Sequence, residues 1–352
     1  MAAARHVLLI ALALGLLAGA AAARPLLVGF YLPWDEASRA SLVRHAGALD
    51  VLAPMSGALD SAAGTVRWQP DPALAPALAA AHGRPRVFPV VSNAHDNVWD
   101  AAAAEGALTD PKAGESFIAA LTAQARAQDY GGYILDFENL NPQDLAAYPA
   151  LLTRLRAALR PLRKELWVTA LLSADPALVQ QLSEATDAVV LMAYDQCWAT
   201  ATPGPVAAQD WLETTLDAKL APKNGRADPS RYVVALGAYG YDWPAGQPAQ
   251  VVSAPQAVQL AKANGQAVVR EAPAANPHFA YKGPLGDTHT VWYLDAAAFR
   301  TQRAAAEARH VRGVAIWRLG LEDPAIWARA IPAAALGPPP AAPRPPCVML
   351  PH

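Results

Sequence analysis

Several things are scarce in this chain of 352 residues, and each scarcity narrows what the protein can be. Only 16% of the residues are charged, and 28 Lys and Arg against 30 Asp and Glu give a formal net charge of -2. Without a basic surplus, the chain lacks the electrostatic footprint of a nucleic-acid-binding protein. No internal repeat is found, and no G-x-G-x-x-G motif follows an apolar strand, so a dinucleotide-binding domain is not indicated.

Cysteine is almost absent. The two that occur, Cys197 and Cys347, have no second Cys or His close by, so their spacing gives no metal signature. An exported protein could pair them, although the proline-rich surroundings of Cys347 argue against an ordered bridge. The sequence therefore leaves the pairing open.

Long apolar runs are absent outside the N-terminus. Residues 7–18 form an unbroken run of small apolar side chains, preceded by Arg5 and His6 and followed by small residues up to Ala23. This order is typical of a secretory signal peptide, here residues 1–23, and the run is too short to span a bilayer comfortably. An uncleaved N-terminal anchor is the alternative. We expect a secreted or periplasmic protein with no membrane span after signal cleavage.

What the chain does contain is a regular alternation of short apolar strands with helical stretches. The eight predicted strands are Leu26–Tyr31, Asp50–Pro54, Arg86–Val91, Gly132–Glu138, Trp167–Leu172, Ala188–Tyr194, Tyr232–Ala238 and Gly313–Trp317. Such alternation predicts a parallel sheet, and eight units predict a closed α/β barrel of the TIM (β/α)8 type. An open doubly wound sheet is the alternative, but it usually carries a glycine-rich phosphate loop.

The predicted barrel domain spans residues 24–335. The stretch between the seventh and eighth strands is too long for one helix, so we expect a small α+β insertion at about residues 245–294. From residue 336 to 352 the chain is rich in proline, which predicts an extended or disordered tail.

Two acids stand at the end of the fourth predicted strand. Strand side chains alternate between the two faces, so Asp136 and Glu138 point the same way, with Cα atoms about 6.6 Å apart. That spacing suits a pair of carboxylates that share one reaction centre, one as proton donor and one as charge stabiliser. Taken alone, the pair is as readily explained by a helix cap and a surface charge.

The ends of the other strands carry further acids and aromatic rings. Barrel enzymes keep their chemistry at this rim, and aromatic rings offer flat apolar faces suited to sugar rings. The residues that we expect to line a sugar site there are Tyr31, Trp34, Asn93, Met192, Tyr194, Asp195, Tyr239, Trp243 and Trp317. Trp317 could instead belong to the core.

Four motifs in this order make the chain resemble glycoside hydrolase family 18, the chitinase-like barrels. Residues 131–138 (GGYILDFE) resemble the family's D-G-x-D-x-D-x-E, and residues 191–195 (LMAYD) resemble its M-x-Y-D. Residues 236–243 (LGAYGYDW) resemble its G-x-P-x-Y-G-x-x-W. Residues 291–295 and 313–320 resemble the segments around its last strand. The likeness covers roughly residues 25–330.

The resemblance implies a role for each matching residue. Glu138 would be the general acid, and the substrate's own 2-acetamido oxygen would be the nucleophile. Asp136 would orient that acetamido group, and Tyr194 would hydrogen-bond its carbonyl oxygen. Asp195 would bind the sugar, and Trp317 would form the floor. It further implies a polysaccharide or oligosaccharide containing N-acetylglucosamine as partner, a monomeric protein, and no cofactor.

The chain departs from the family pattern at positions that bear on activity. Gly131 and Ile134 stand where the family has acids, and Ala238 replaces a proline. Ile134 cannot share a proton with Asp136 as an acid there would. The sequence thus favours a glycosidase, since Glu138 is retained, and leaves a glycan-binding barrel that no longer cuts as the alternative. A third, weaker reading is an accessory domain for exopolysaccharide export.

Overall fold

A computed structural model describes residues 24–80, 84–95, 98–220, 228–328, 336–337 and 346–349. The predicted signal peptide and most of the predicted tail lie outside the described residues. Within the described part, no helix is both long enough and apolar enough to cross a membrane.

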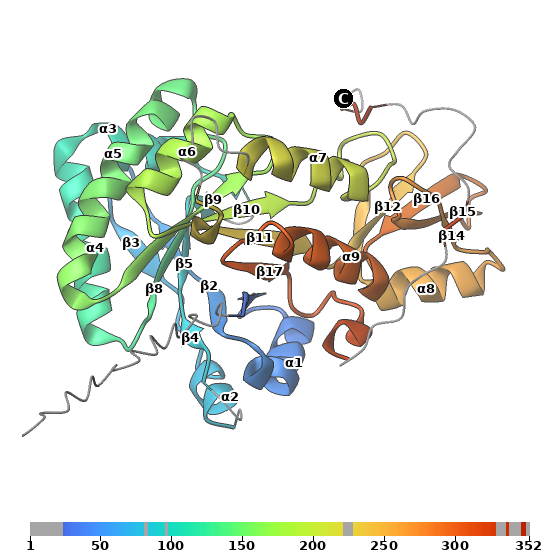
Figure 1. Cartoon of the computed structure of the whole chain (residues 1–352), viewed down its shortest axis with the longest axis horizontal. Helices are drawn as coiled ribbons and strands as arrows, with labels where there is room; N and C mark the ends of the chain where they lie inside the picture. The colour runs from blue at the N-terminus through green and yellow to red at the C-terminus, as the bar shows by residue number, and fades with distance from the viewer. Residues whose placement is uncertain are drawn as a thin grey trace, which may run out of the picture.

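Eight parallel strands close into a barrel, which confirms the predicted fold class (Figure 1). Closure is visible in the pairing of β1 with both β2 and β17. The barrel strands are β1 (Leu26–Tyr31), β2 (Val51–Leu59), β5 (Val90–Ser92), β8 (Gly132–Asp136), β9 (Glu165–Leu171), β10 (Ala188–Ala193), β11 (Tyr232–Gly237) and β17 (Gly313–Trp317). The open doubly wound alternative is wrong, because such a sheet keeps two free edges.

Short strands flank the barrel. The third predicted strand is split, since β4 (Arg86–Val87) pairs with β2 and Pro89, which has no N–H to donate, precedes β5. β2 continues beyond the barrel and pairs with β3 (Val66–Trp68). A two-stranded ribbon follows β5, formed by β6 (Ala94–His95) and β7 (Val98–Trp99).

Helices cover the outside of the barrel, and their starts are encoded locally. Asn141 accepts a hydrogen bond from the Asp144 N–H at 2.8 Å, and Pro142 occupies the first turn, where a missing N–H costs nothing. Asp110 and Asp175 cap helices in the same way. The helices are α1 (Glu36–His45), α2 (Leu74–Ala80), α3 (Ala101–Thr109), α4 (Pro111–Ala127), α5 (Pro142–Leu159), α6 (Pro176–Ala185), α7 (Gln209–Leu220), α8 (Ala254–Ala263) and α9 (Ala296–Glu307).

An antiparallel sheet with one helix lies between β11 and β17 in sequence and beside the barrel in space (Figure 1). Its strands are β12 (Gly240–Pro244), β13 (Gln250–Val252), β14 (Val269–Arg270), β15 (Pro277–Lys282) and β16 (Thr288–Tyr293). α8 packs on this sheet through a separate apolar cluster. The insertion thus starts at Gly240, five residues before the position expected from the sequence, because β12 follows β11 almost directly.

Two apolar layers follow from the alternation of side chains along each barrel strand. One fills the barrel interior and includes Val28, Phe30, Ile134, Trp167 and Val190. The other, larger layer lies between the barrel and its helices and takes the neighbouring residues of the same strands. A side chain at a strand end therefore faces either the mouth of the barrel or the helices, according to its position in that alternation.

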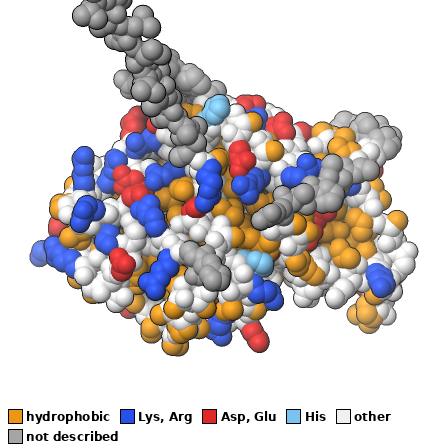
Figure 2. Space-filling view, turned by 60° about the horizontal axis from the view of Figure 1, so that its bottom comes forward, with side chains coloured by type: hydrophobic (Ala, Val, Ile, Leu, Met, Phe, Trp, Pro, Cys, Tyr) orange, Lys and Arg blue, Asp and Glu red, His pale blue; other side chains and the backbone are white. Residues whose placement is uncertain are grey.

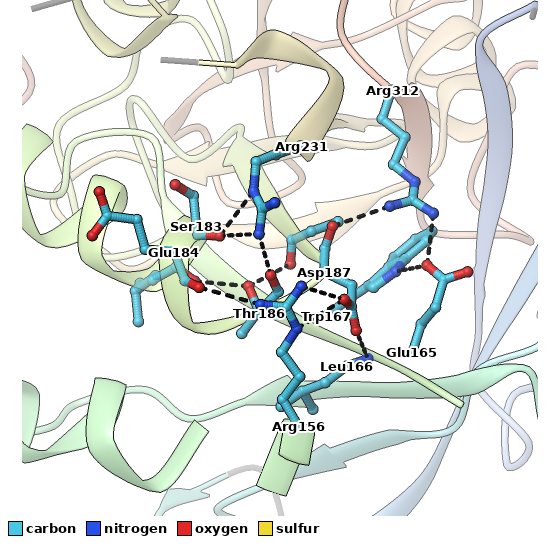
Figure 3. Close-up of polar contacts among 12 residues, drawn as sticks. Arg156, Glu165, Leu166, Trp167, Ser183, Glu184, Thr186, Asp187, Arg231 and Arg312 are labelled. Carbon is cyan, nitrogen blue, oxygen red and sulfur yellow. Dashed lines mark hydrogen bonds and ion pairs between the residues drawn. The ribbon is translucent and has the colours of Figure 1, made fainter. Parts of the chain in front are cut away.

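Charged side chains close the bottom of the barrel, where the strands begin (Figure 3). Arg312 donates to Glu165 at 2.6 Å, and its guanidinium lies 5.1 Å from the centre of the buried Trp167 ring. Asp187 accepts from the Leu166 N–H and from Arg156, each at 2.9 Å. These contacts stabilise the end of the barrel opposite the rim at which barrel enzymes carry their chemistry.

The two cysteines are joined, Cys197 to Cys347, with their Cα atoms 5.3 Å apart. The sequence left this pairing open, and the structure shows the bridge. The described part of the tail also pairs with the barrel loop after β10, since the Thr202 N–H donates to the Val348 carbonyl at 2.8 Å. The tail is held by backbone contacts as well as by the covalent bond.

Candidate active site

Asp136 and Glu138 stand at the mouth of the barrel, at the end of β8. Ile134, two residues earlier, belongs to the barrel interior, whereas Tyr133, Leu135 and Phe137 pack against the helices. The alternation predicted from the sequence is therefore present. Asp136 is 4% exposed and Glu138 is half-buried, so neither is an ordinary surface charge.

The backbone of Glu138 is clamped by Asn93, which follows β5. The Glu138 N–H donates to Asn93 Oδ1 at 2.9 Å, and Asn93 Nδ2 donates to the Glu138 carbonyl at 3.0 Å. Asn93 Nδ2 also donates to the carbonyl of Asp100 at 3.1 Å. Because the side chain is fully buried and its amide is engaged, the expectation that Asn93 contacts sugar is corrected: it holds the backbone of Glu138 instead.

Asp136 receives its hydrogen bond from the neighbouring strand. Thr169 Oγ1 donates to Asp136 Oδ1 at 2.7 Å, and Thr169 is itself 7% exposed. On the β8 side, Ile134 offers only methyl groups. Sequence reasoning missed Thr169, although its place in β9 beside Asp136 follows from the register that pairs Leu135 with Val168.

The electrostatics of the pair favour one proton on Glu138. Burial, then the negative charge of Asp136, then that of Asp195 raise the pKa of Glu138 well above its usual range. Burial also raises the pKa of Asp136, but the Thr169 hydrogen bond opposes that rise. The outcome is a protonated glutamic acid beside a more acidic carboxyl, as acid catalysis near neutral pH requires.

Tyr194 and Trp317 form an aromatic wall at the same rim. Their rings are stacked, with centroids 6.0 Å apart and an interplanar angle of 14°. Burial, followed by the charges of Asp136, Glu138 and Asp195, raises the pKa of Tyr194 well above its usual range, so the phenol keeps its proton. Phe30 meets the Trp317 ring edge-on at 5.3 Å. The wall and the acids thus belong to one site.

Asp195 is held by two phenols, one from the segment between β11 and β12 and one from β12. Tyr239 and Tyr241 both donate to Asp195 Oδ1, the second at 2.9 Å. Asp195 has a positive φ of 56°, which turns the chain sharply after β10. Burial raises the pKa of Asp195, while the two phenolic hydrogen bonds lower it. Tyr241 was not among the residues expected to bind sugar.

Not every predicted residue reaches this site. Tyr31 is fully buried, belongs to the layer under the helices and donates to Asp71 at 2.6 Å, so the expected sugar contact is corrected. Its neighbour Phe30 takes the inward position. Trp243 is 1% exposed, in an apolar cluster that the insertion shares with the loop after β10, and cannot stack on a sugar. The first error is the choice of the wrong member of an alternating pair at the end of β1. Trp243, in contrast, lies on the same side of β12 as Tyr241 and is buried against it, with ring centroids 5.2 Å apart.

Two further predicted residues lie at the rim in different settings. Met192 is 7% exposed and lies in β10, two residues before Tyr194, so both side chains point into the barrel. Trp34 is 55% exposed on the loop after β1, and the nearby Asp35 pairs with Arg318 at 2.9 Å. Trp34 is therefore a free aromatic face on the loop that leaves the barrel mouth.

In the described residues, no group of three or more His, Cys, Asp and Glu side chains is arranged to hold a metal ion. Figure 2 shows a face on which basic, acidic and hydrophobic side chains are interspersed.

Comparison with known proteins gives consistent likenesses to a family model, to curated proteins and to a solved structure. The family model described as "Glycosyl hydrolases family 18" matches residues 100–322. A "Cortical fragment-lytic enzyme" of Bacillus subtilis (strain 168) is 28% identical over 242 residues, which are 62% of this chain and 53% of that protein. The chain therefore spans about half the length of that relative.

Two other proteins match over nearly their whole length. The "Uncharacterized glycosylase YvbX" of Bacillus subtilis (strain 168) is 24% identical over 322 residues, which are 88% of this chain and 91% of that one. The crystal structure of a chitinase from Chromobacterium violaceum superposes with a TM-score of 0.78 at 26% identity, covering 86% of this chain and 97% of that chain.

Proposed function

Because the chain belongs to glycosyl hydrolases family 18, we propose that it is a glycosidase that hydrolyses a β-linked glycan containing N-acetylglucosamine, with Glu138 as the general acid. The observation that carries this proposal is the pairing of a half-buried Glu138, clamped by Asn93, with the buried Asp136. A protonated carboxyl group at a barrel mouth is what cleavage of a glycosidic bond needs.

The proposed reaction begins with the substrate's own acetamido group. Its carbonyl oxygen attacks the anomeric carbon while the Glu138 carboxyl group gives its proton to the departing glycosidic oxygen. The Asp136 carboxylate accepts the acetamido N–H and balances the positive charge of the oxazolinium ion. The Glu138 carboxylate then takes a proton from water as the water oxygen attacks the anomeric carbon. The bond between that carbon and the acetamido oxygen breaks, which opens the oxazolinium ring and returns the sugar with its original anomeric configuration.

The aromatic residues have a separate part in this proposal. Trp317 lies under the reactive sugar, and the Tyr194 hydroxyl donates to the attacking acetamido oxygen. Asp195 has one oxygen occupied by the two phenols, which leaves its other oxygen for a sugar hydroxyl or the acetamido group. Trp34 is the exposed ring on which a further sugar of the chain can stack.

The names of the relatives support the proposed class of substrate. One is called a cortical fragment-lytic enzyme and another a chitinase, and N-acetylglucosamine in β linkage is common to cell-wall glycan and chitin. We propose that the protein acts as a monomer. We also propose that it works outside the cytoplasm, on the strength of residues 1–23 and the Cys197–Cys347 bridge.

The first test is Glu138→Gln, which keeps the shape of the side chain and removes its acidity. We expect the wild type to release labelled products from N-acetylglucosamine oligomers, chitin or peptidoglycan, and the variant to lose at least about 100-fold in kcat. Glu105→Gln, an exposed glutamate on α3, is the matched control. Equal rates for the wild type and Glu138→Gln would remove the proposed role of Glu138.

A glycan-binding barrel without activity is the second candidate. It is favoured by one observation, the apolar Ile134 beneath Asp136. The same glycan panel distinguishes the two candidates: saturable binding of an oligomer by the wild type, with no product by mass analysis at any pH, would select the binding protein.

A further inference from the structure

We infer that Thr169 is a positioning residue for the proposed hydrolysis: its hydroxyl holds the Asp136 carboxylate ionised and oriented, with one oxygen left free for the reaction. This inference rests on the proposed function of the Asp136–Glu138 pair and assigns a part to a residue on another strand. Thr169 acts through Asp136 and makes no contact of its own with substrate.

The geometry is that of two neighbouring strands at one level of the barrel. β8 and β9 are parallel, and Leu135 pairs with Val168, so Asp136 and Thr169 lie side by side. The Thr169 Oγ1 is 2.7 Å from Asp136 Oδ1 and 3.4 Å from the Leu135 carbonyl oxygen. A hydroxyl has one proton, and the shorter contact to the charged acceptor takes it.

Threonine is suited to this task by its shape. Its branched Cβ restricts the first side-chain torsion, so the hydroxyl is oriented before substrate arrives. Thr169 is buried next to the inward-facing Trp167 of its own strand, which limits its freedom further. A buried and restricted donor loses little entropy when it holds a carboxylate.

Asp136 depends on this single donor. Among the described residues, no other side chain or N–H donates a hydrogen bond to its carboxyl group, and Oδ2 accepts none. Ile134 lies on the same face of β8 and is fully buried. A buried carboxylate without a donor is costly, so the loss of the Thr169 hydroxyl would favour the neutral form of Asp136.

That change would reach the general acid. The negative charge of Asp136 is one of the causes that raise the pKa of Glu138, and the Thr169 hydrogen bond is what lowers the pKa of Asp136 against the effect of burial. Thr169 therefore helps to keep the two pKa values apart, with the proton on Glu138 and the charge on Asp136. The pair titrates as a unit, so its two apparent pKa values define the active window.

The test compares Thr169→Val, which has nearly the same shape and no hydroxyl, with Thr169→Ser, which keeps the hydroxyl. We expect Thr169→Val to lose roughly 10- to 100-fold in kcat with a smaller change in KM. The acidic limb of the bell-shaped dependence of kcat on pH should move to higher pH by about one unit in Thr169→Val, which narrows the pH range of activity. Thr169→Ser should stay within about 3-fold of the wild type, with the limb unmoved.

Thr122→Val is the matched control, because Thr122 is also buried but donates to the Ile118 carbonyl within its own helix. It should leave the rate and the pH profile unchanged. Thermal unfolding midpoints of all variants show whether they fold. If Thr169→Val does not fold, Thr169→Ala is measured instead, since it removes the hydroxyl without adding bulk.

A second readout needs no activity. Carboxyl carbon NMR of protein labelled at aspartate follows the titration of Asp136 directly, and we expect its midpoint to be higher in Thr169→Val than in the wild type. An unchanged midpoint, or a Thr169→Ser variant as impaired as Thr169→Val, would overturn the inference. An active Glu138→Gln would instead overturn the proposed function, and the NMR comparison would still decide the role of Thr169.

Discussion

Glu138 holds a proton because its surroundings make ionisation costly. Burial is the largest cause, and the charges of Asp136 and Asp195 add to it. A carboxyl group whose pKa is raised on folding does not lower the free energy of unfolding below its unfolded pKa. As the pH rises from there through the folded pKa, the group lowers that free energy. The fold is therefore less stable in alkaline solution by the same effect that makes Glu138 a proton donor near neutral pH.

This effect gives a prediction for Asp195. A general acid must be protonated, so activity falls as the pH rises through the pKa of Glu138. Asp195→Asn removes one negative charge, which lowers that pKa and should move the alkaline limb of kcat/KM to lower pH. The pH profile of hydrolysis measures it, with the exposed Asp129→Asn as control. An alkaline limb that does not move would mean that the Asp195 charge is not felt at Glu138.

At the scale of elements, the candidate site is formed by residues from the ends of several barrel strands. β8 carries the acids, β9 supplies Thr169, the loop after β5 supplies Asn93, and β10 and β17 supply the Tyr194–Trp317 wall. The strands could be located in the sequence because they are apolar on both faces. Which side chain at each end turns inward depends on a one-residue choice, which is why Tyr31 was expected at the site and Phe30 was not.

The clamp between the β5 and β8 loops can be tested with Asn93→Ala. This change leaves the backbone N–H and carbonyl of Glu138 without partners, so the free energy of unfolding should fall by about 2 kcal/mol. We expect kcat to fall by at least roughly 10-fold, because a displaced acid no longer meets the leaving oxygen. Denaturant unfolding and steady-state kinetics measure both effects.

Asn264→Ala provides the comparison, since its side chain makes a single hydrogen bond, to the Leu260 carbonyl at 2.9 Å, at the end of α8. A smaller loss of stability and an unchanged kcat are expected there. If Asn93→Ala were no more harmful than Asn264→Ala, the clamp would have no part in positioning Glu138.

At the scale of the whole molecule, charged side chains cover the end of the barrel at which the strands begin, and the candidate site lies at the opposite end. The insertion sheet stands beside the open end, and Tyr241 of this sheet donates to Asp195 together with Tyr239, which directly precedes the sheet. The Cys197–Cys347 bridge joins the loop that follows Asp195 to the C-terminal tail. Cys197 also packs in the apolar cluster that contains Trp243 of the insertion. Tail, insertion and barrel rim are thus linked at one place.

Breaking that bridge should weaken the fold. Its cysteines are 150 residues apart in sequence, and a covalent link over a long loop restricts the unfolded chain strongly. We expect the double variant Cys197→Ser, Cys347→Ser to lose about 2–5 kcal/mol of stability. The wild type treated with a reductant should show the same thermal midpoint as the variant. No difference between oxidised and reduced protein would contradict this expectation.

The sequence by itself determined the closed barrel, the positions of its strands and the facing of Asp136 and Glu138, because these follow from apolar runs and from the two-residue period of a strand. Only the tertiary structure decided that Thr169 serves Asp136, that Asn93 serves the Glu138 backbone and that Cys347 reaches Cys197. Those contacts join residues that are 33, 45 and 150 positions apart. Their existence depends on register, closure and the path of loops, which no local pattern records.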